Sequence, residues 1–84
     1  MIIAWTDQAW NEYLFWQKHD KKVLKRINEL IRDTKRHPEE GIGKPEALRF
    51  DLKGKWSRRI NQEHRLVYQM IDKMVVIFQC RYHY

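Results

Sequence analysis

The first half of the chain has the hydrophobic periodicity of a short strand followed by two amphipathic helices. Residues 2–5 are largely apolar and predict a strand. Thr6 follows with a hydroxyl suited to an N-cap, and Asp7 places a negative charge in the first turn of a helix expected over residues 7–18. Three side chains recur on one side of this helix: Ala9, Tyr13 and Trp16.

A second helix is predicted directly behind the first. Asp20 is its N-cap, and an apolar stripe follows at the spacing of one buried helix face. The stripe consists of Val23, Leu24, Ile27, Leu30 and Ile31. Pro38 cannot continue a helix, so this helix is expected to end before it. Because the joint between the helices is so short, the two are expected to form an antiparallel hairpin.

The second half of the chain changes to the pattern of strands. Glycine and proline mark a loop over residues 39–45. Apolar runs then predict four strands, at residues 47–52, 55–61, 64–71 and 74–81. The element order β-α-α-β-β-β-β predicts an α+β fold in which a two-helix layer covers one face of an antiparallel sheet. No linker or repeat interrupts the pattern, so we expect one domain over residues 1–84.

Even and odd positions of these strands differ in polarity. The even positions are apolar: Ile60, Leu66, Tyr68, Met70, Val76, Phe78 and Cys80. The odd positions are mostly polar: Arg59, Asn61, Arg65, Gln69, Gln79, Arg81 and His83. If both hairpin connections have odd length or contain a bulge, all even positions face the helices and all odd positions face outward. The pattern then predicts a cationic open face that carries Arg59, Arg65, Arg81 and His83.

The charge of the chain indicates a polyanionic partner. Its 84 residues include 17 Lys and Arg against 11 Asp and Glu, which gives a formal net charge of +6. Nucleic acid is the commonest polyanion, although an acidic protein would suit the same surplus. The single cysteine allows no internal disulfide, no signal peptide is apparent, and no apolar run reaches membrane-spanning length. We therefore expect a cytoplasmic protein with no membrane partner.

The predicted open face has the side chains needed to cleave RNA without a metal or cofactor. Arginine presents a fork of donors that matches phosphate oxygens, and His83 lies among three arginines. Glu46, just before the first strand of the second half, would stay ionised among these cations and could accept a proton. RNA supplies its own nucleophile in the 2′-hydroxyl, so a base, an acid and a cation suffice. Glu46, His83 and Arg65 can fill those roles.

Other kinds of site have weaker support. Cys80 and His83 have the interval of a metal-ligand pair, but no second such pair exists in the chain. Ser57 is the only serine and lacks the surroundings of a nucleophile elbow. His64 follows Glu63 at a predicted turn, and we expect it to be a surface residue without a catalytic role.

Six short motifs resemble the YoeB toxins, within the wider RelE-type superfamily of bacterial toxin–antitoxin ribonucleases, and the match spans the whole chain. They are Trp5 with Trp10 and Tyr13; Ile27–Ile31 with Asp33 and Thr34; Gly43–Glu46; Trp56–Ile60; Glu63–Tyr68; and Cys80–Tyr84. The resemblance implies a compact α+β fold of the RelE type. It also implies cleavage of messenger RNA in the decoding site of the 70S ribosome.

The same resemblance assigns site residues and partners. It implies a general base at Glu46, a general acid at His83, transition-state-stabilising arginines at Arg59 and Arg65, and assistance from Tyr84. The family pattern has a lysine shortly after the glutamate, where this chain has Arg49, which keeps the charge and changes the geometry. The implied partners are a YefM-like antitoxin and a second copy of the chain, with operator DNA contacted only through the antitoxin complex.

The leading hypothesis is therefore a bacterial endoribonuclease toxin that acts on translated messenger RNA. Further basic residues are expected to bind the RNA or the ribosome: Lys44, Arg49, Lys53, Lys55, Arg58 and Arg81. One rival is a non-catalytic nucleic-acid-binding module that uses the same basic sheet. A second rival is a protein–protein module whose basic face meets an acidic partner.

Overall fold

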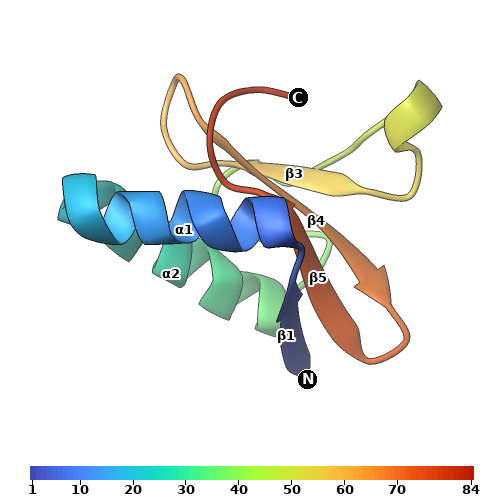
Figure 1. Cartoon of the computed structure of the whole chain (residues 1–84). Coiled ribbons are helices and arrows are strands. Elements are labelled where there is room, and N and C mark those ends of the chain that lie inside the picture. Colours follow the sequence, from blue (N-terminus) through green and yellow to red (C-terminus); the bar gives the residue numbers. More distant parts are fainter.

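The computed structural model describes residues 1–84 and has the predicted α+β fold and order of elements (Figure 1). The elements are β1 (Ile2–Trp5), α1 (Asp7–His19), α2 (Lys21–Arg36), β2 (Glu46–Ala47), a short 3₁₀ helix (Phe50–Leu52), β3 (Trp56–Arg59), β4 (Arg65–Ile71) and β5 (Met74–Gln79). The five strands form one sheet in the order β1-β5-β4-β3-β2. No helix combines the length and apolar composition needed to span a membrane.

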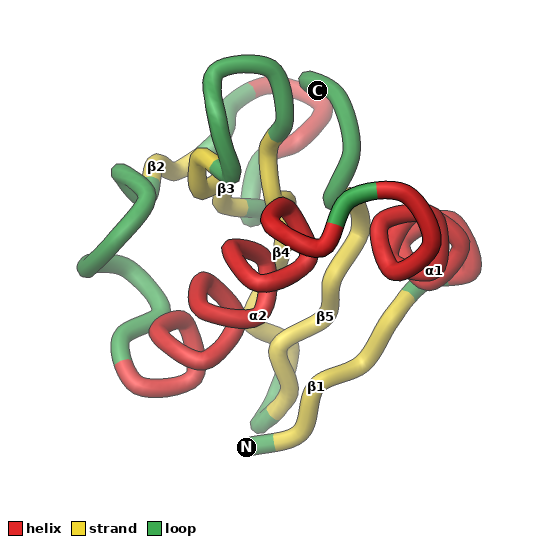
Figure 2. Tube along the Cα trace, turned by 90° about the vertical axis from the view of Figure 1, so that its left-hand side faces the viewer, coloured by secondary structure: helices red, strands yellow, loops and turns green.

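Both helices begin at the predicted caps. Thr6 Oγ1 accepts the N–H of Ala9 at 3.1 Å, and Asp20 Oδ1 accepts the N–H groups of Lys22 and Val23 at 3.0 and 3.2 Å. The helices run in opposite directions and lie against one face of the sheet (Figures 1 and 2). The chain therefore has the predicted two-helix layer, and no helix covers the other face of the sheet.

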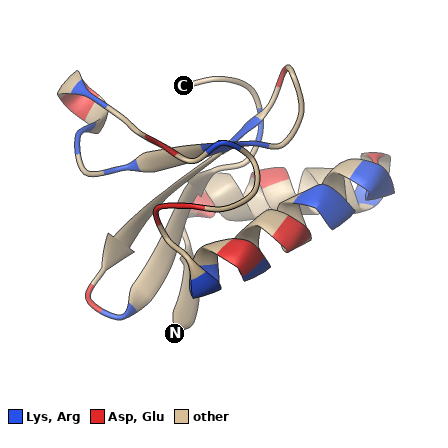
Figure 3. Cartoon of the chain, turned by 180° about the vertical axis from the view of Figure 1, so that it is seen from behind, with Lys and Arg blue, Asp and Glu red and all other residues tan.

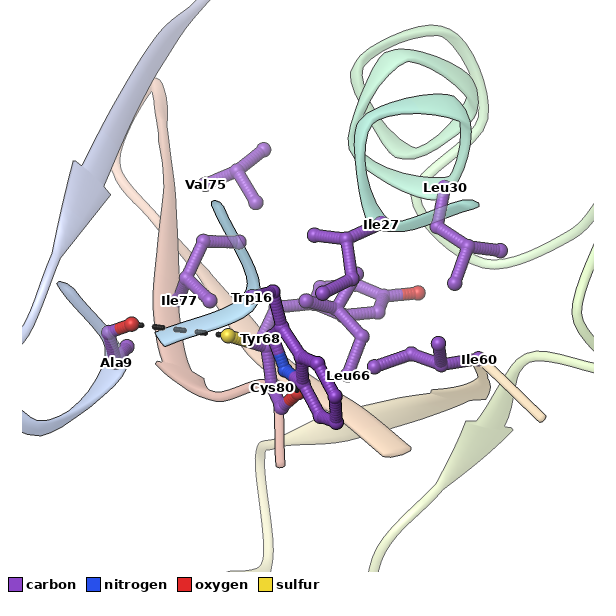
Figure 4. Close-up of a cluster of buried hydrophobic side chains, with 10 residues drawn as sticks. All are labelled: Ala9, Trp16, Ile27, Leu30, Ile60, Leu66, Tyr68, Val75, Ile77 and Cys80. Atoms are coloured by element: carbon purple, nitrogen blue, oxygen red, sulfur yellow. Dashed lines mark hydrogen bonds between the residues drawn. The ribbon is translucent and has the colours of Figure 1, made fainter. Parts of the chain in front are cut away.

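The core lies between this helical layer and the sheet. Ten buried side chains form it: Ala9, Trp16, Ile27, Leu30, Ile60, Leu66, Tyr68, Val75, Ile77 and Cys80 (Figure 4). The stripe predicted on the second helix contributes Ile27 and Leu30, both without exposed area. Burial raises the pKa of the Cys80 thiol to about 12, so this cysteine is a packing residue at neutral pH.

Two strands differ from the sequence prediction. β1 pairs with β5 in parallel, with Ile3 opposite Val75, so the sheet is mixed and only its other pairings are antiparallel. The chain leaves β1 through the two helices, and such a crossover permits parallel pairing. The predicted strand 47–52 is also wrong beyond Ala47. Phe50 has a φ of +56°, which is incompatible with an extended strand and begins the 3₁₀ helix.

The predicted alternation holds across β3 and β4 but fails in most of β5. Arg59 lies opposite Arg65, joined by an odd five-residue connection, residues 60–64. The β4–β5 turn has two residues, 72 and 73, so Met70 pairs with Val75 and the parity changes. Val75 and Ile77 are consequently buried. The predicted inward positions Val76 and Phe78 therefore face the open side. A bulge at Phe78 restores the predicted parity for the residues that follow.

Arg58 is a further correction, because its side chain has no exposed area and points to the helix side of the sheet. Its guanidinium donates to Asp33 Oδ2 at 2.6 Å, and its Nε donates to the Tyr68 hydroxyl at 3.1 Å. It also donates to the carbonyl groups of His37, Glu40 and Ile42. The prediction that Arg58 binds RNA or the ribosome is therefore wrong, because its donors are used within the fold.

This buried guanidinium fixes the connection that leads from α2 to Glu46. Asp33 also accepts the N–H of Ile42 at 3.0 Å, and its hydrogen bond with Arg58 lowers the pKa of the Asp33 carboxyl. Gly41 passes so close that a Cβ there would lie 2.1 Å from Asp33 Oδ2. The position of Glu46 thus depends on an ion pair beneath the sheet.

Candidate active site on the open face of the sheet

Strand register places four residues in one row across the open face. Glu46 lies opposite Ser57, Ser57 opposite Val67, and Val67 opposite Gln79. Residues directly opposite one another in a sheet point to the same face. The exposed Glu46 carboxylate is at one end of this row, on the edge strand β2, and Gln79 is at the other.

Two arginines lie directly opposite each other further along β3 and β4. Arg59 and Arg65 are paired in the register, two residues beyond Ser57 and Val67 and hence on the same face. Arg59 is exposed, whereas Arg65 Nη1 donates to the carbonyl groups of Asn61 and His64 at 2.7 and 3.1 Å. Like charges in this position repel each other, so the pair favours a bound anion. Phosphate suits two guanidinium groups.

The C-terminal tail, residues 80–84, turns back over this face (Figure 1). Gln79 Nε2 donates to the carbonyl groups of Arg81, Tyr82 and His83 at 2.9, 3.1 and 2.8 Å. The N–H of Arg65 donates to the Tyr82 carbonyl at 3.0 Å. These contacts hold the tail backbone against β4, beside one of the two arginines.

The last residue of the tail reaches across to β3. Ser57 Oγ donates to the Tyr84 hydroxyl at 3.4 Å, and Ser57 is the residue opposite Glu46. Ser57 and Val67 are only 3% and 2% exposed, although both belong to the open face. We attribute this burial to the tail, whose contacts with Arg65 and Ser57 bracket Val67. His83, which is exposed, lies in the chain between these two contacts.

A cavity of about 320 Å³ adjoins Glu46. It is lined by Glu46, Ala47, Leu48, Arg49, Phe50, Leu52 and Tyr84. The cavity brings together two residues implied by the family resemblance, Glu46 and Tyr84, and adds Arg49, which stands in place of the family lysine. A carboxylate, a phenol and a guanidinium thus meet at a cavity with mainly apolar walls.

The predicted basic surface is only partly free to bind RNA. Lys44, Arg49 and Lys53 are exposed, while Lys55 Nζ lies 4.6 Å from the centre of the Phe78 ring. Lys and Arg residues occur on α2 as well as beside the candidate site (Figure 3). The cationic surface of the chain is therefore wider than the sheet.

Arg81 does not occupy the predicted position on the open face. Its guanidinium carbon lies 3.6 Å from the centre of the Phe15 ring of α1, with the Tyr82 ring at 4.7 Å. The alternation could not place it, because β5 ends at Gln79 and the tail turns away from the strand direction. The expectation that Arg81 lies free on the open face is wrong, whereas its binding to RNA or the ribosome stays a prediction. Arg81 is a half-buried cation that packs on aromatic rings.

His64 is the residue that the sequence prediction missed. It is 6% exposed, and its Nδ1 accepts the N–H of Tyr82 at 2.7 Å. Its ring packs edge-on against Trp16, with the ring centres 4.8 Å apart. The signal was available, since position 64 is even and the alternation predicts that even positions face inward. The adjacent Glu63 and the turn favoured a surface position instead.

Known proteins share both the sequence and the fold of this chain. Toxin YoeB of Escherichia coli K12 is 55% identical over 84 residues, which cover 100% of both chains. The YoeB/ParE toxin from Agrobacterium tumefaciens is 46% identical, with a TM-score of 0.96 and full coverage of both chains. YoeB of Staphylococcus aureus is similar both as a dimer and in a YoeB–YefM complex. Each gives a TM-score of 0.93 over 100% of this chain and 98% of the other, at 48% and 47% identity.

These relatives define a class of small bacterial toxins. The family model described as the YoeB-like toxin of bacterial type II toxin–antitoxin systems matches residues 5–84. The chain belongs to this family, as its motifs predicted.

Proposed function

We propose that this toxin is an endoribonuclease that cleaves messenger RNA in the A site of the bacterial ribosome and so inhibits translation. The observation that carries the proposal is the path of the tail. Its contacts run from Arg65 to Ser57, and Ser57 lies opposite Glu46. His83 lies in the chain between these two contacts, which supports a position close to the carboxylate and the two arginines.

The proposed reaction uses the 2′-hydroxyl of the RNA as the nucleophile. Glu46 accepts the proton of this hydroxyl, and the 2′-oxygen forms a bond to the adjacent phosphorus. Arg59 and Arg65 stabilise the charge that builds up on the phosphoryl oxygens, with Tyr84 assisting. The bond to the 5′-oxygen breaks, and His83 gives that oxygen a proton. The products are a 2′,3′-cyclic phosphate and a 5′-hydroxyl end.

Residues around the site would position the RNA and the ribosome. Lys44, Arg49 and Lys53 are exposed cations near Glu46 in the sequence, and Lys55 follows them just before β3. Contacts of this type bind phosphate groups irrespective of sequence and weaken as the salt concentration rises. They favour ribosomal RNA as the surface on which the enzyme docks, in the bacterial cytoplasm.

The proposed regulator is a YefM-like antitoxin encoded with the toxin. The similarity to the Staphylococcus aureus protein solved in a YoeB–YefM complex supports this partner, and the dimer of the same relative supports a second copy of the chain. Operator DNA would be contacted through the antitoxin complex. The proposal treats all 84 residues as one toxin domain.

The test is cleavage of programmed ribosomes and of naked RNA in parallel. Glu46→Ala and His83→Gln should each lower the cleavage rate by a factor on the order of 10² to 10⁴, while circular dichroism shows an intact fold. Primer extension separates this function from a non-catalytic RNA-binding module, because a binder creates no new 5′ ends. Wild-type protein that binds ribosomes without producing such ends would refute the proposal.

A further inference from the structure

His64 is a buried ionisable side chain that the proposed reaction does not use. Its ring is enclosed by Trp16 of α1 on one side, and its backbone is held by Asn61, whose Oδ1 accepts the N–H of His64 at 2.7 Å. The His64 carbonyl accepts the N–H of Ile60 at 3.0 Å. A ring so enclosed cannot reach a substrate, so any effect on the reaction must pass through a neighbouring group.

The neighbouring group is the peptide N–H of Tyr82. It donates to His64 Nδ1 at 2.7 Å, which requires an unprotonated Nδ1 and therefore the neutral ring with its proton on Nε2. Nε2 lies 3.6 Å from Glu63 Oε1, too far for a direct hydrogen bond, so the contact with the Tyr82 N–H is what specifies this tautomer. The ring thus presents a fixed acceptor to the tail one residue before His83.

Tyr82 needs such an acceptor because its backbone is in an unfavourable conformation. Its φ of +64° lies in the left-handed region, which large side chains rarely adopt. Such a residue keeps its conformation only when surrounding contacts hold it. Here the N–H is held by His64, and the carbonyl is held by the N–H of Arg65 and by Gln79 Nε2. This is the point at which the chain turns back toward Ser57.

We propose that His64 is a positioning residue that holds the Tyr82 peptide and thereby sets the His83 imidazole over the phosphate held by Arg59 and Arg65. The inference rests on the proposed function. This role depends on the acceptor atom Nδ1 and not on the imidazole ring itself. A side chain that offers an acceptor at the position of Nδ1 should support catalysis, and one that offers its polar group at the position of Nε2 should not.

Two substitutions of His64 distinguish an acceptor at the position of Nδ1 from one at the position of Nε2. Asn places its amide oxygen near the position of Nδ1, whereas Gln places its amide group near that of Nε2. Both remove the ring packing against Trp16, so the pair differs mainly in the acceptor. In single-turnover cleavage of programmed ribosomes, His64→Gln should lower the rate by about tenfold to a hundredfold, the cost of a misplaced catalytic group. His64→Asn should stay within about threefold of wild type. Ribosome binding should be equal in all three.

Hydrogen exchange of the Tyr82 amide measures the same contact without any reaction. Exchange should accelerate in His64→Gln and stay slow in His64→Asn, while the amides of Val75 and Ile77 keep their protection in both. His37→Gln, at a histidine whose side chain is 55% exposed, is the matched control and should change neither readout. If His64→Gln does not fold, His64→Asn still tests the role, because fast Tyr82 exchange or cleavage far below wild type in that variant would overturn it.

Equal rates for His64→Gln and wild type, or equal losses for the Gln and Asn variants, would overturn the positioning role. Faster Tyr82 exchange without a loss of cleavage would overturn it too. A wild-type protein that cleaves nothing would refute the proposed function and with it the catalytic part of this inference. The exchange data would still show whether His64 holds the tail, so the two failures are distinguishable.

Discussion

Neutralising Asp33 should destabilise the chain more than any comparable change at its surface. Asp33→Asn removes the only carboxylate paired with Arg58, whose side chain is fully buried, while the Asp33 side chain is 20% exposed. Removing one partner of a buried ion pair costs about 3–5 kcal/mol, because the remaining charge is left without its counter-ion. The carbonyl groups around Arg58 offset part of this loss. We therefore expect a loss near the lower end, about 3 kcal/mol.

A loss of about 3 kcal/mol is large compared with the free energy of unfolding of a small domain, which is about 5–15 kcal/mol. It corresponds to a fall in melting temperature of about 12–24 °C for a chain of this size. Urea unfolding followed by circular dichroism measures it, with the exposed Asp51→Asn as the matched control. A difference between the two variants below about 0.5 kcal/mol, the usual range for surface substitutions, would refute the assignment of Arg58 as a buried, carboxylate-dependent cation.

The pH dependence gives a second test of the same pair. The pKa of Asp33 is lowered from its ordinary value of 3.8, with the hydrogen bond from Arg58 as the largest cause. A carboxyl with a lowered folded-state pKa stabilises the fold above its ordinary pKa, and this contribution disappears as the pH falls through the lowered value. The stability difference between wild type and Asp33→Asn should therefore be constant near neutral pH and shrink below about pH 4. A difference that grew on acidification would contradict this.

Three further outcomes follow from the structure. Phe50→Gly should raise the free energy of unfolding by about 1 kcal/mol in urea titrations, because Phe50 is 91% exposed and holds a φ of +56°. Cys80 should resist thiol reagents in the folded protein at pH 8 and react once urea unfolds it, since burial raises its pKa to about 12; rapid labelling of the native chain would place the thiol outside the core. Tyr68→Phe should lower the free energy of unfolding by about 1–3 kcal/mol, because it removes the hydroxyl that accepts from Arg58 Nε and donates to the Pro38 carbonyl. An unchanged unfolding midpoint would contradict that network.

The helices were predictable because their signals are local. Caps at Thr6 and Asp20 and an apolar stripe fixed both starts and the buried faces without reference to the rest of the chain. The parity of β3 and β4 was also predicted, because Ile60, Leu66, Tyr68 and Met70 are apolar at even positions while Arg59, Arg65 and Gln69 are polar at odd ones. The place of His83 on the open face was also predicted, and the backbone contact of the tail with Arg65 and the side-chain contact of Tyr84 with Ser57 are consistent with it.

β5 could not be predicted in the same way, because Val75, Val76, Ile77 and Phe78 are apolar at odd and even positions alike. Which β5 side chains face the core depends on a two-residue turn and a bulge, and the alternation alone specifies neither. Arg58 and His64 were also predicted to be exposed, because charged and polar residues usually lie on the surface. Their even-numbered positions indicated the opposite, and both are buried. Their burial depends on partners distant in sequence, Asp33 for the arginine and Tyr82 for the histidine.

The most direct test of the central claim is the rate at which His83→Gln cleaves RNA that carries a single bridging 5′-sulfur at the cleaved linkage. A thiolate leaves without protonation, because thiols are far more acidic than alcohols, so this substrate removes the need for a general acid. The account predicts that the 5′-thio substrate restores His83→Gln to near the wild-type rate and leaves Glu46→Ala inactive. A His83→Gln variant that is as slow on the 5′-thio substrate as on ordinary RNA would contradict the role of the tail histidine as the acid.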